Sequence, residues 1–167
     1  MLKPVKQKKL KTRAAAFAIV ASQYNARYVD AMLRAARTAL KRAGAATVQV
    51  VRVPGAFEIP TVAAKLAQNS QLSALGHQLS AIICLGVIFQ GETSHAQHIG
   101  WGVTHALAQI QLQHRIPVIH GVFTFENEAQ ARVRCLGRRH NRGTEAARTA
   151  LEMARVMAAL RRAAREK

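Results

Sequence analysis

Four short apolar runs lie along the chain, and between them apolar residues recur every three or four positions. The runs are continuous rather than alternating, which is typical of strands buried on both faces of a parallel sheet. The recurring pattern indicates helices that cover such a sheet. The expected strands cover residues 15–21, 47–53, 79–89 and 116–124, and the expected helices cover residues 25–44, 60–69, 93–114, 126–136 and 144–162.

This order of elements predicts a three-layer α/β/α sandwich with a central, mostly parallel sheet, and we expect the flavodoxin-like form of it. The chain has 167 residues, which is enough for one such domain but too few for two domains that each bury a core of their own. We expect a flexible basic tail at residues 1–13, a single domain at residues 14–162 and a basic tail at residues 163–167.

The expected cellular setting follows from three features. No apolar run approaches the roughly 18 residues that a membrane-spanning helix needs, so we expect no membrane contact. The N-terminus lacks the apolar region and cleavage site of a secretory signal. Cys84 and Cys135 have neither metal-ligand spacing nor a disulfide framework around them. Together these features favour a soluble protein in a reducing cytoplasm.

The charge is the unusual part of the composition, because the chain has 25 Lys and Arg residues but only 8 Asp and Glu residues, which gives a formal net charge of +17. Basic side chains concentrate at the two ends of the chain. Such ends are usually solvated tails, but a polyanion partner is the alternative reading, and the composition leaves both open. The terminal basic residues are Lys3, Lys6, Lys8, Lys9, Lys11, Arg13, Arg155, Arg161, Arg162, Arg165 and Lys167.

The segments that follow the expected strands carry the chemistry. Ligands of parallel α/β sheets bind beyond the carboxyl ends of the strands, so these segments are expected to converge at one edge. They read SQYN at residues 22–25, VPGAFEIP at 53–60 and QGETSH at 90–95, and the fourth expected strand ends near HGVFT at 120–124.

The turn at Gly91 precedes an expected helix, and its free N–H groups and the helix dipole suit a phosphate. His95 lies at the start of that helix, where it is either a general acid/base or a capping or surface histidine. His95, His98 and His105 share roughly one helix face, but no carboxylate or cysteine nearby completes a ligand set. We therefore expect no metal site.

Other side chains in these segments keep two readings. Glu58 can accept hydrogen bonds from sugar hydroxyls or pair with a basic side chain. Tyr24 and Phe57 can form walls for a flat heterocycle or belong to the core. Arg134 and Arg138 can clamp a phosphate, or they belong to a solvated basic face.

Taken together, the motifs resemble those of the lumazine synthase family over about residues 17–160. Five motifs occur in the family's order and spacing, which is far more specific than any one of them. They are VPGAFEIP at 53–60, the stretch from LG at 85–86 to GETSH at 91–95, PVI at 117–119, residues 127–134, and NRG at 141–143 followed by EAA at 145–147.

The resemblance implies a condensation of 5-amino-6-ribitylamino-uracil with 3,4-dihydroxy-2-butanone 4-phosphate. The products would be 6,7-dimethyl-8-ribityllumazine, phosphate and water, in the penultimate step of riboflavin biosynthesis. The amine would attack the ketone to form an imine, phosphate would leave by elimination, and the ring would then close. Every step moves protons, and none implies a metal or an organic cofactor.

The resemblance also implies a role for each matched residue. Arg134 and His120 would come from the adjacent subunit of a homopentamer, which itself can assemble into a larger shell. Tyr24 would stack on the uracil ring, and the ribityl chain would be lined by Ala56, Phe57 and Glu58. Ile88 and Phe89 would offer backbone groups to the heterocycle. Phosphate would be bound by Glu92, Thr93 and Arg134, and His95 would shuttle protons.

The chain departs from the family pattern at a few of these positions. Ala96 and Gln97 follow His95, where the family usually has an aromatic residue and a carboxylate, and His120 replaces a phenylalanine. A missing carboxylate leaves the imidazole less strongly oriented. These changes favour one alternative, a weakly active or inactive relative that binds flavin or lumazine. A second alternative is a shell scaffold whose basic tails hold polyanions.

Overall fold

The computed structural model describes residues 15–69, 78–137 and 140–165. Four strands form one parallel sheet in the order β2-β1-β3-β4. The strands are β1 (Ala16–Ser22), β2 (Thr47–Val53), β3 (Leu79–Phe89) and β4 (Val118–Phe125). The sequence placed β2 and β3 correctly and β1 and β4 within two residues, because continuous apolar runs mark buried parallel strands strongly. The strand order is that of flavodoxin-like proteins.

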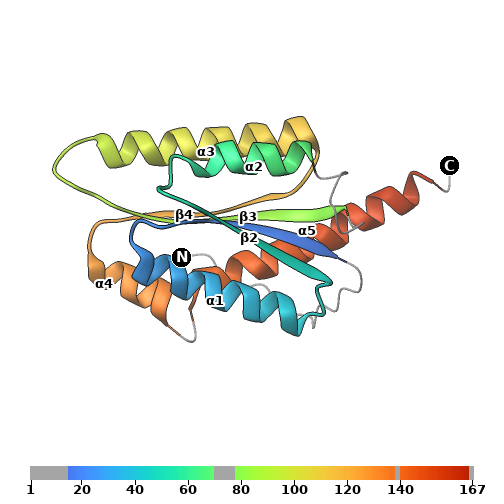
Figure 1. Cartoon of the computed structure of the whole chain (residues 1–167), viewed down its shortest axis with the longest axis horizontal. Coiled ribbons are helices and arrows are strands. Elements are labelled where there is room, and N and C mark those ends of the chain that lie inside the picture. Colours follow the sequence, from blue (N-terminus) through green and yellow to red (C-terminus); the bar gives the residue numbers. More distant parts are fainter. Residues whose placement is uncertain (1–14, 70–77, 138–139, 166–167) are drawn as a thin grey trace.

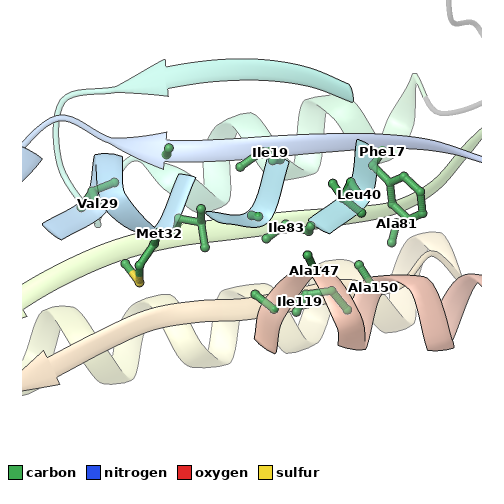
Figure 2. Packing of buried hydrophobic residues seen from close by; sticks show 14 of the residues in the cluster. Phe17, Ile19, Val29, Met32, Leu40, Ala81, Ile83, Ile119, Ala147 and Ala150 are labelled. Carbon is green, nitrogen blue, oxygen red and sulfur yellow. The ribbon is translucent and has the colours of Figure 1, made fainter. Parts of the chain in front are cut away.

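Helices cover both faces of the sheet, which confirms the three-layer sandwich. Figure 1 shows α2 (Ile59–Gln68) and α3 (His95–His114) above the sheet, and α1 (Ala26–Arg42) and α5 (Arg142–Ala163) below it. Each face has its own hydrophobic core. Figure 2 shows one of them, where Phe17 and Ile19 of β1 lie among side chains of α1, β3 and α5. The sheet is therefore a rigid platform whose carboxyl edge is free to hold a site.

The segment after β4 differs from the expected single helix over residues 126–136. A short α-helix, α4 (Glu128–Ala131), passes into a π-helical turn, η1 (Arg132–Leu136). The backbone becomes extended at Gly137, and a Cβ there would lie 2.8 Å from the carbonyl oxygen of Val133. The predicted helix therefore ends where expected and starts two residues later, but its second half is π-helical, because apolar spacing cannot distinguish an α-turn from a single π-turn.

Asn141 joins this turn to the last helix. Its side-chain Nδ2 donates to the carbonyl oxygen of Cys135, and its Oδ1 accepts from the N–H groups of Gly143 and Thr144. One buried amide therefore closes the end of η1 and caps the start of α5. The whole expected N-terminal tail, residues 1–13, lies outside the described residues, and so do residues 166–167 of the expected C-terminal tail.

Candidate active site

The loops after β1 and β2 are bonded to each other at the carboxyl edge of the sheet. The N–H of Gln23 donates to the carbonyl oxygen of Val53 at 2.8 Å, and the N–H of Tyr24 donates to that of Pro54 at 3.0 Å. Asn25 has the left-handed backbone conformation (φ 57°) that asparagine tolerates well. Its Nδ2 donates to the carbonyl oxygen of Val87 on β3 at 2.8 Å. Three neighbouring strands are thus tied together where their loops begin.

Tyr24 and Glu58 meet around Gly55. The N–H of Gly55 donates to Oε2 of Glu58 at 2.8 Å. A Cβ on Gly55 would lie 2.8 Å from that oxygen and 3.0 Å from the ring of Tyr24, so a side chain here would push both groups apart. Glu58 makes no ion pair within the described residues. Its carboxylate is held by the backbone and keeps lone pairs for a ligand's hydroxyl groups.

Two aromatic rings stand exposed at this edge. Tyr24 keeps 69% and Phe57 keeps 61% of its surface exposed, so neither belongs to the core of the single chain. The Phe57 ring lies over Gly102 of α3, 3.7 Å from where a Cβ would be. Ala56 beside it is buried. These rings offer flat apolar surface to a heterocycle or to another subunit.

The loop between β3 and α3 is open and polar. Ile88 and Phe89 end β3 half-buried, and the residues from Gly91 to His95 are exposed. Gln90 shapes the loop, because its Nε2 donates to the carbonyl oxygens of Gly91 and Thr93, each at 3.3 Å. Within the described ranges, the N–H groups of Glu92 and Thr93 have no protein acceptor. Two free donors beside a helix start suit an anionic oxygen.

His95 is the first residue of α3, and its N–H donates to Oγ1 of Thr93 at 3.4 Å. The imidazole is exposed, while the neighbouring Ala96 is buried and Gln97 points to solvent. No carboxylate in the described part of the chain forms an ion pair with it. The ring is therefore accessible, and no acidic group of the described residues orients it.

His120 does not lie at the carboxyl edge, which corrects the expectation that β4 ends near it. It is the third residue of β4 and pairs with Cys84, whereas Ile88 at the edge pairs with Thr124. Four residues of a parallel strand span about 13 Å. Its Nε2 lies 2.9 Å from Oγ1 of Thr104 on α3. Burial lowers the pKa of His120, and its own backbone carbonyl opposes this in part.

Arg134 lies exposed on η1, on the α1 side of the sheet, and forms no ion pair with an acidic side chain in the described ranges. Within the described ranges, no hydrogen bond or ion pair joins Arg134 to the loop at Gly91. Arg138, the other half of the expected arginine clamp, falls outside the described residues. Arg142 instead pairs with Glu145 at 2.5 Å and lies over the ring of Phe123.

Sequence reasoning missed several residues that shape the site. Asn25 had a recognisable signal, since asparagine directly before a helix often takes a left-handed conformation. Thr104 had none, because it looks like any exposed helical threonine. Gly55 and Asn141 were seen as parts of motifs, but their contacts join segments far apart in the chain and are invisible locally.

Neither cysteine is suited to chemistry at this site. Cys84 and Cys135 are both buried free thiols. Burial raises the pKa of Cys135 to about 11 and raises that of Cys84 as well. Among the described residues, no three His, Cys, Asp or Glu side chains gather as a metal-ligand group, and no helix is long and apolar enough to cross a membrane.

Fold and site together define a class: a parallel α/β protein whose loops after three adjacent strands are joined at the carboxyl edge of the sheet, where proteins of this class bind their ligands. Comparison with known proteins then gives the family. The chain belongs to the 6,7-dimethyl-8-ribityllumazine synthase family, whose model matches residues 14–158.

Individual relatives agree with this assignment. The chain is 38% identical over 146 residues to 6,7-dimethyl-8-ribityllumazine synthase of Stenotrophomonas maltophilia (strain R551-3), which covers 86% of this chain and 90% of that protein. It is 39% identical over 150 residues to the protein of the same name from Xanthomonas campestris pv. campestris (strain B100), which covers 89% of this chain and 93% of that protein.

Proposed function

We propose that this chain catalyses the condensation of 5-amino-6-ribitylamino-uracil with 3,4-dihydroxy-2-butanone 4-phosphate to 6,7-dimethyl-8-ribityllumazine. The observation that carries the proposal is the convergence of Tyr24, Glu58 and the open Gly91 loop at one sheet edge in a member of this family. The edge offers a stacking ring, an acceptor for hydroxyls and free N–H donors. These are the groups that a ribityl-bearing heterocycle and a phosphate ester require.

The heterocyclic substrate is bound by the loops after β1 and β2. Tyr24 stacks on the uracil ring, and the segment of Ala56, Phe57 and Glu58 lines the ribityl chain. The carboxylate of Glu58, held by the N–H of Gly55, accepts from the ribityl hydroxyls. Ile88 and Phe89 offer backbone groups from the end of β3. The exposure of both rings supports this assignment over a role in the core.

The phosphate ester is bound at the start of α3. The N–H groups of Glu92 and Thr93, which have no acceptor among the described residues, donate to the phosphate, and Arg134 neutralises it. His95 moves the protons. The primary amine attacks the ketone, imine formation and ring closure each release water, and phosphate leaves by elimination between those steps. His95 takes and returns protons in this sequence as the general acid/base.

The active unit is a homo-oligomer, a pentamer or a larger shell, in which neighbouring subunits share each site. The roughly 13 Å between His120 and the carboxyl edge supports this, because one chain cannot bring His120 to its own β3 loop. His120 and Arg134 therefore act in the neighbour's site. We place the protein in the cytoplasm, which suits its two free thiols, and we assign residues 14–162 to one domain.

A second candidate is a relative that binds lumazine or flavin with little turnover. The exposed imidazole of His95, without a carboxylate partner in the described residues, favours it. Both candidates predict ligand binding, so binding alone does not separate them.

The decisive experiment is the formation of 6,7-dimethyl-8-ribityllumazine, followed by its absorbance, from the two purified substrates with and without EDTA. Turnover that is unchanged by EDTA is the expected result. Tight lumazine binding without turnover would support the second candidate, and a rate that EDTA abolishes and added metal restores would contradict a metal-free mechanism.

A further inference from the structure

His120 faces α3 from an edge strand. Alternate residues of β4 point to opposite faces, and Val118 and Val122, which flank His120 on its own face, pack in the core beneath α2 and α3. His120 itself is only partly buried, and Nε2 of its ring lies 2.9 Å from Oγ1 of Thr104. The imidazole is therefore held at Nε2, while Nδ1 has no hydrogen-bond partner among the described residues.

The direction of this hydrogen bond follows from a second one. Oγ1 of Thr104 lies 2.7 Å from the carbonyl oxygen of Gly100 and donates to it, because a carbonyl can only accept. A hydroxyl has a single hydrogen, so Oγ1 has none left for His120. It must accept from the ring, and Nε2 of His120 must carry the hydrogen.

A neutral imidazole has one N–H and one lone-pair nitrogen. With the hydrogen fixed on Nε2, Nδ1 presents a lone pair. Burial favours the neutral ring by lowering its pKa, although its own backbone carbonyl opposes this in part. Within the described residues, no carboxylate pairs with the ring and stabilises the cation. Nδ1 is therefore a hydrogen-bond acceptor at neutral pH.

We propose that Thr104 is a positioning residue that sets the tautomer of His120, so that Nδ1 accepts a hydrogen bond from an N–H of the heterocycle bound in a neighbouring copy's site. This inference rests on the proposed function. A phenylalanine at this position offers an apolar wall without any acceptor, so the histidine adds selectivity for heterocycles that carry an N–H on the facing edge.

The direct test is 15N NMR of protein labelled in histidine, with the His120 signals identified by their loss in His120→Asn. We expect a protonated Nε2 and an unprotonated Nδ1 in the free protein. Saturation with 6,7-dimethyl-8-ribityllumazine should shift the Nδ1 resonance upfield, as acceptance of a hydrogen bond does. A hydrogen on Nδ1 in the free protein, or an Nδ1 signal that lumazine leaves unchanged, would overturn the proposal.

Variants of Thr104 provide the matched comparison. Thr104→Val keeps the shape but removes the oxygen, so both tautomers should appear and the Kd for lumazine should rise roughly two- to tenfold, the range of one neutral hydrogen bond. Thr104→Ser keeps the oxygen and should restore both the tautomer and the affinity. A Thr104→Val protein that retains the wild-type tautomer would show that Thr104 does not set it.

The outcomes also separate this inference from the proposed function. If lumazine is formed and bound while Nδ1 remains unaffected, the inference fails and the enzymatic assignment stands. If lumazine neither forms nor binds to the wild-type protein, both fail. Circular dichroism and size-exclusion profiles of the variants should match those of the wild type, which excludes unfolding as the cause of any change.

Discussion

At the scale of single residues, Arg134 is the side chain whose role can be tested most selectively. Its guanidinium is exposed and makes no ion pair in the described ranges, so it is available for an anionic ligand. Charge-assisted hydrogen bonds contribute roughly 1.5–3 kcal/mol, about ten- to a hundredfold in affinity.

We expect Arg134→Ala to raise the KM for 3,4-dihydroxy-2-butanone 4-phosphate by about ten- to a hundredfold. The Kd for 6,7-dimethyl-8-ribityllumazine, which has no phosphate, should change much less. Arg132→Ala is the matched control, because Arg132 is also an exposed cation on the same turn. Equal losses for both ligands, or for both variants, would indicate a general effect on η1 instead of phosphate recognition.

His95 lacks the neighbouring carboxylate that would orient it, and this limits the expected contribution of acid/base catalysis. Positioned catalysis of this kind contributes about 10²–10⁴-fold. We expect His95→Ala to reduce kcat by roughly ten- to a hundredfold, at or below the lower end of that range, since an imidazolium without a partner is less stabilised. The KM for the phosphate substrate should change little.

Gln97→Glu is the companion variant, and it should raise kcat if orientation of the imidazole is what the chain lacks. His98→Ala, which removes another exposed histidine of α3, should leave kcat unchanged. Full activity of His95→Ala would mean that the two bound substrates react without this proton shuttle, through proximity alone.

At the scale of elements, the contact between α1 and α5 depends on small residues. The buried face of α5 consists mainly of alanines, and Figure 2 shows Ala147 and Ala150 packed near the sheet. At its first turn Gly143 approaches α1 so closely that a Cβ would lie 1.9 Å from the carbonyl oxygen of Met32. Because the atom it meets belongs to the backbone, a helix must move to admit a methyl group.

We expect Gly143→Ala to lower the free energy of unfolding by about 1–3 kcal/mol or more, because overpacking against backbone is not relieved by a rotamer change. The midpoint of urea denaturation measures this. Gly91→Ala is the control, since nothing lies within 4 Å of its Cβ position, and its stability should change by less than about 1 kcal/mol. Similar midpoints for the two variants would mean that α1 and α5 separate at little cost.

At the scale of the whole molecule, α3 presents an apolar stripe that the single chain leaves uncovered. Trp101 is 72% and Leu112 is 76% exposed. Together with His105 and Ala108, which are also exposed, they follow the 4-3-4 spacing of a helix–helix seam. Exposed apolar surface of this kind marks an interface, which agrees with the proposed homo-oligomer.

Leu112→Glu should therefore weaken the assembly, because it places a charge in the seam, whereas Gln113→Glu on the neighbouring exposed position should not. Light scattering after size exclusion gives the oligomeric state. Trp101 is the single tryptophan of the chain, so its emission should shift to the red when the assembly dissociates. A monomeric wild-type protein with red-shifted emission would contradict the shared-site arrangement.

The excess of positive charge also belongs to the whole molecule. The tail at residues 1–13 is outside the described residues, but α1 adds exposed cations at Arg34, Arg37, Lys41 and Arg42. Contact with a polyanion therefore remains a proposal for this surface and the tails together. Retention of nucleic acid that falls steeply as salt rises would support it.

Much of this protein can be predicted from sequence alone because the determining signals are local. Continuous apolar runs and helical periods placed the strands and long helices, since each depends on burial of neighbouring residues. The same signals predicted the loops that carry Tyr24, Glu58 and His95. The ordered motifs identified the family that the comparisons then established.

Only the tertiary structure decided the features that depend on contacts between distant segments. The packing of strands and helices against one another sets the order β2-β1-β3-β4 and the place of His120 within β4. It also sets the π-helical turn that contains Arg134. The hydrogen bond between His120 and Thr104 links β4 to α3, and no spacing along the chain encodes it. The periodicity of apolar side chains shows which face of a helix or strand is buried. The neighbouring helix or strand that packs on that face decides the register and the contact partners, and the periodicity does not encode them.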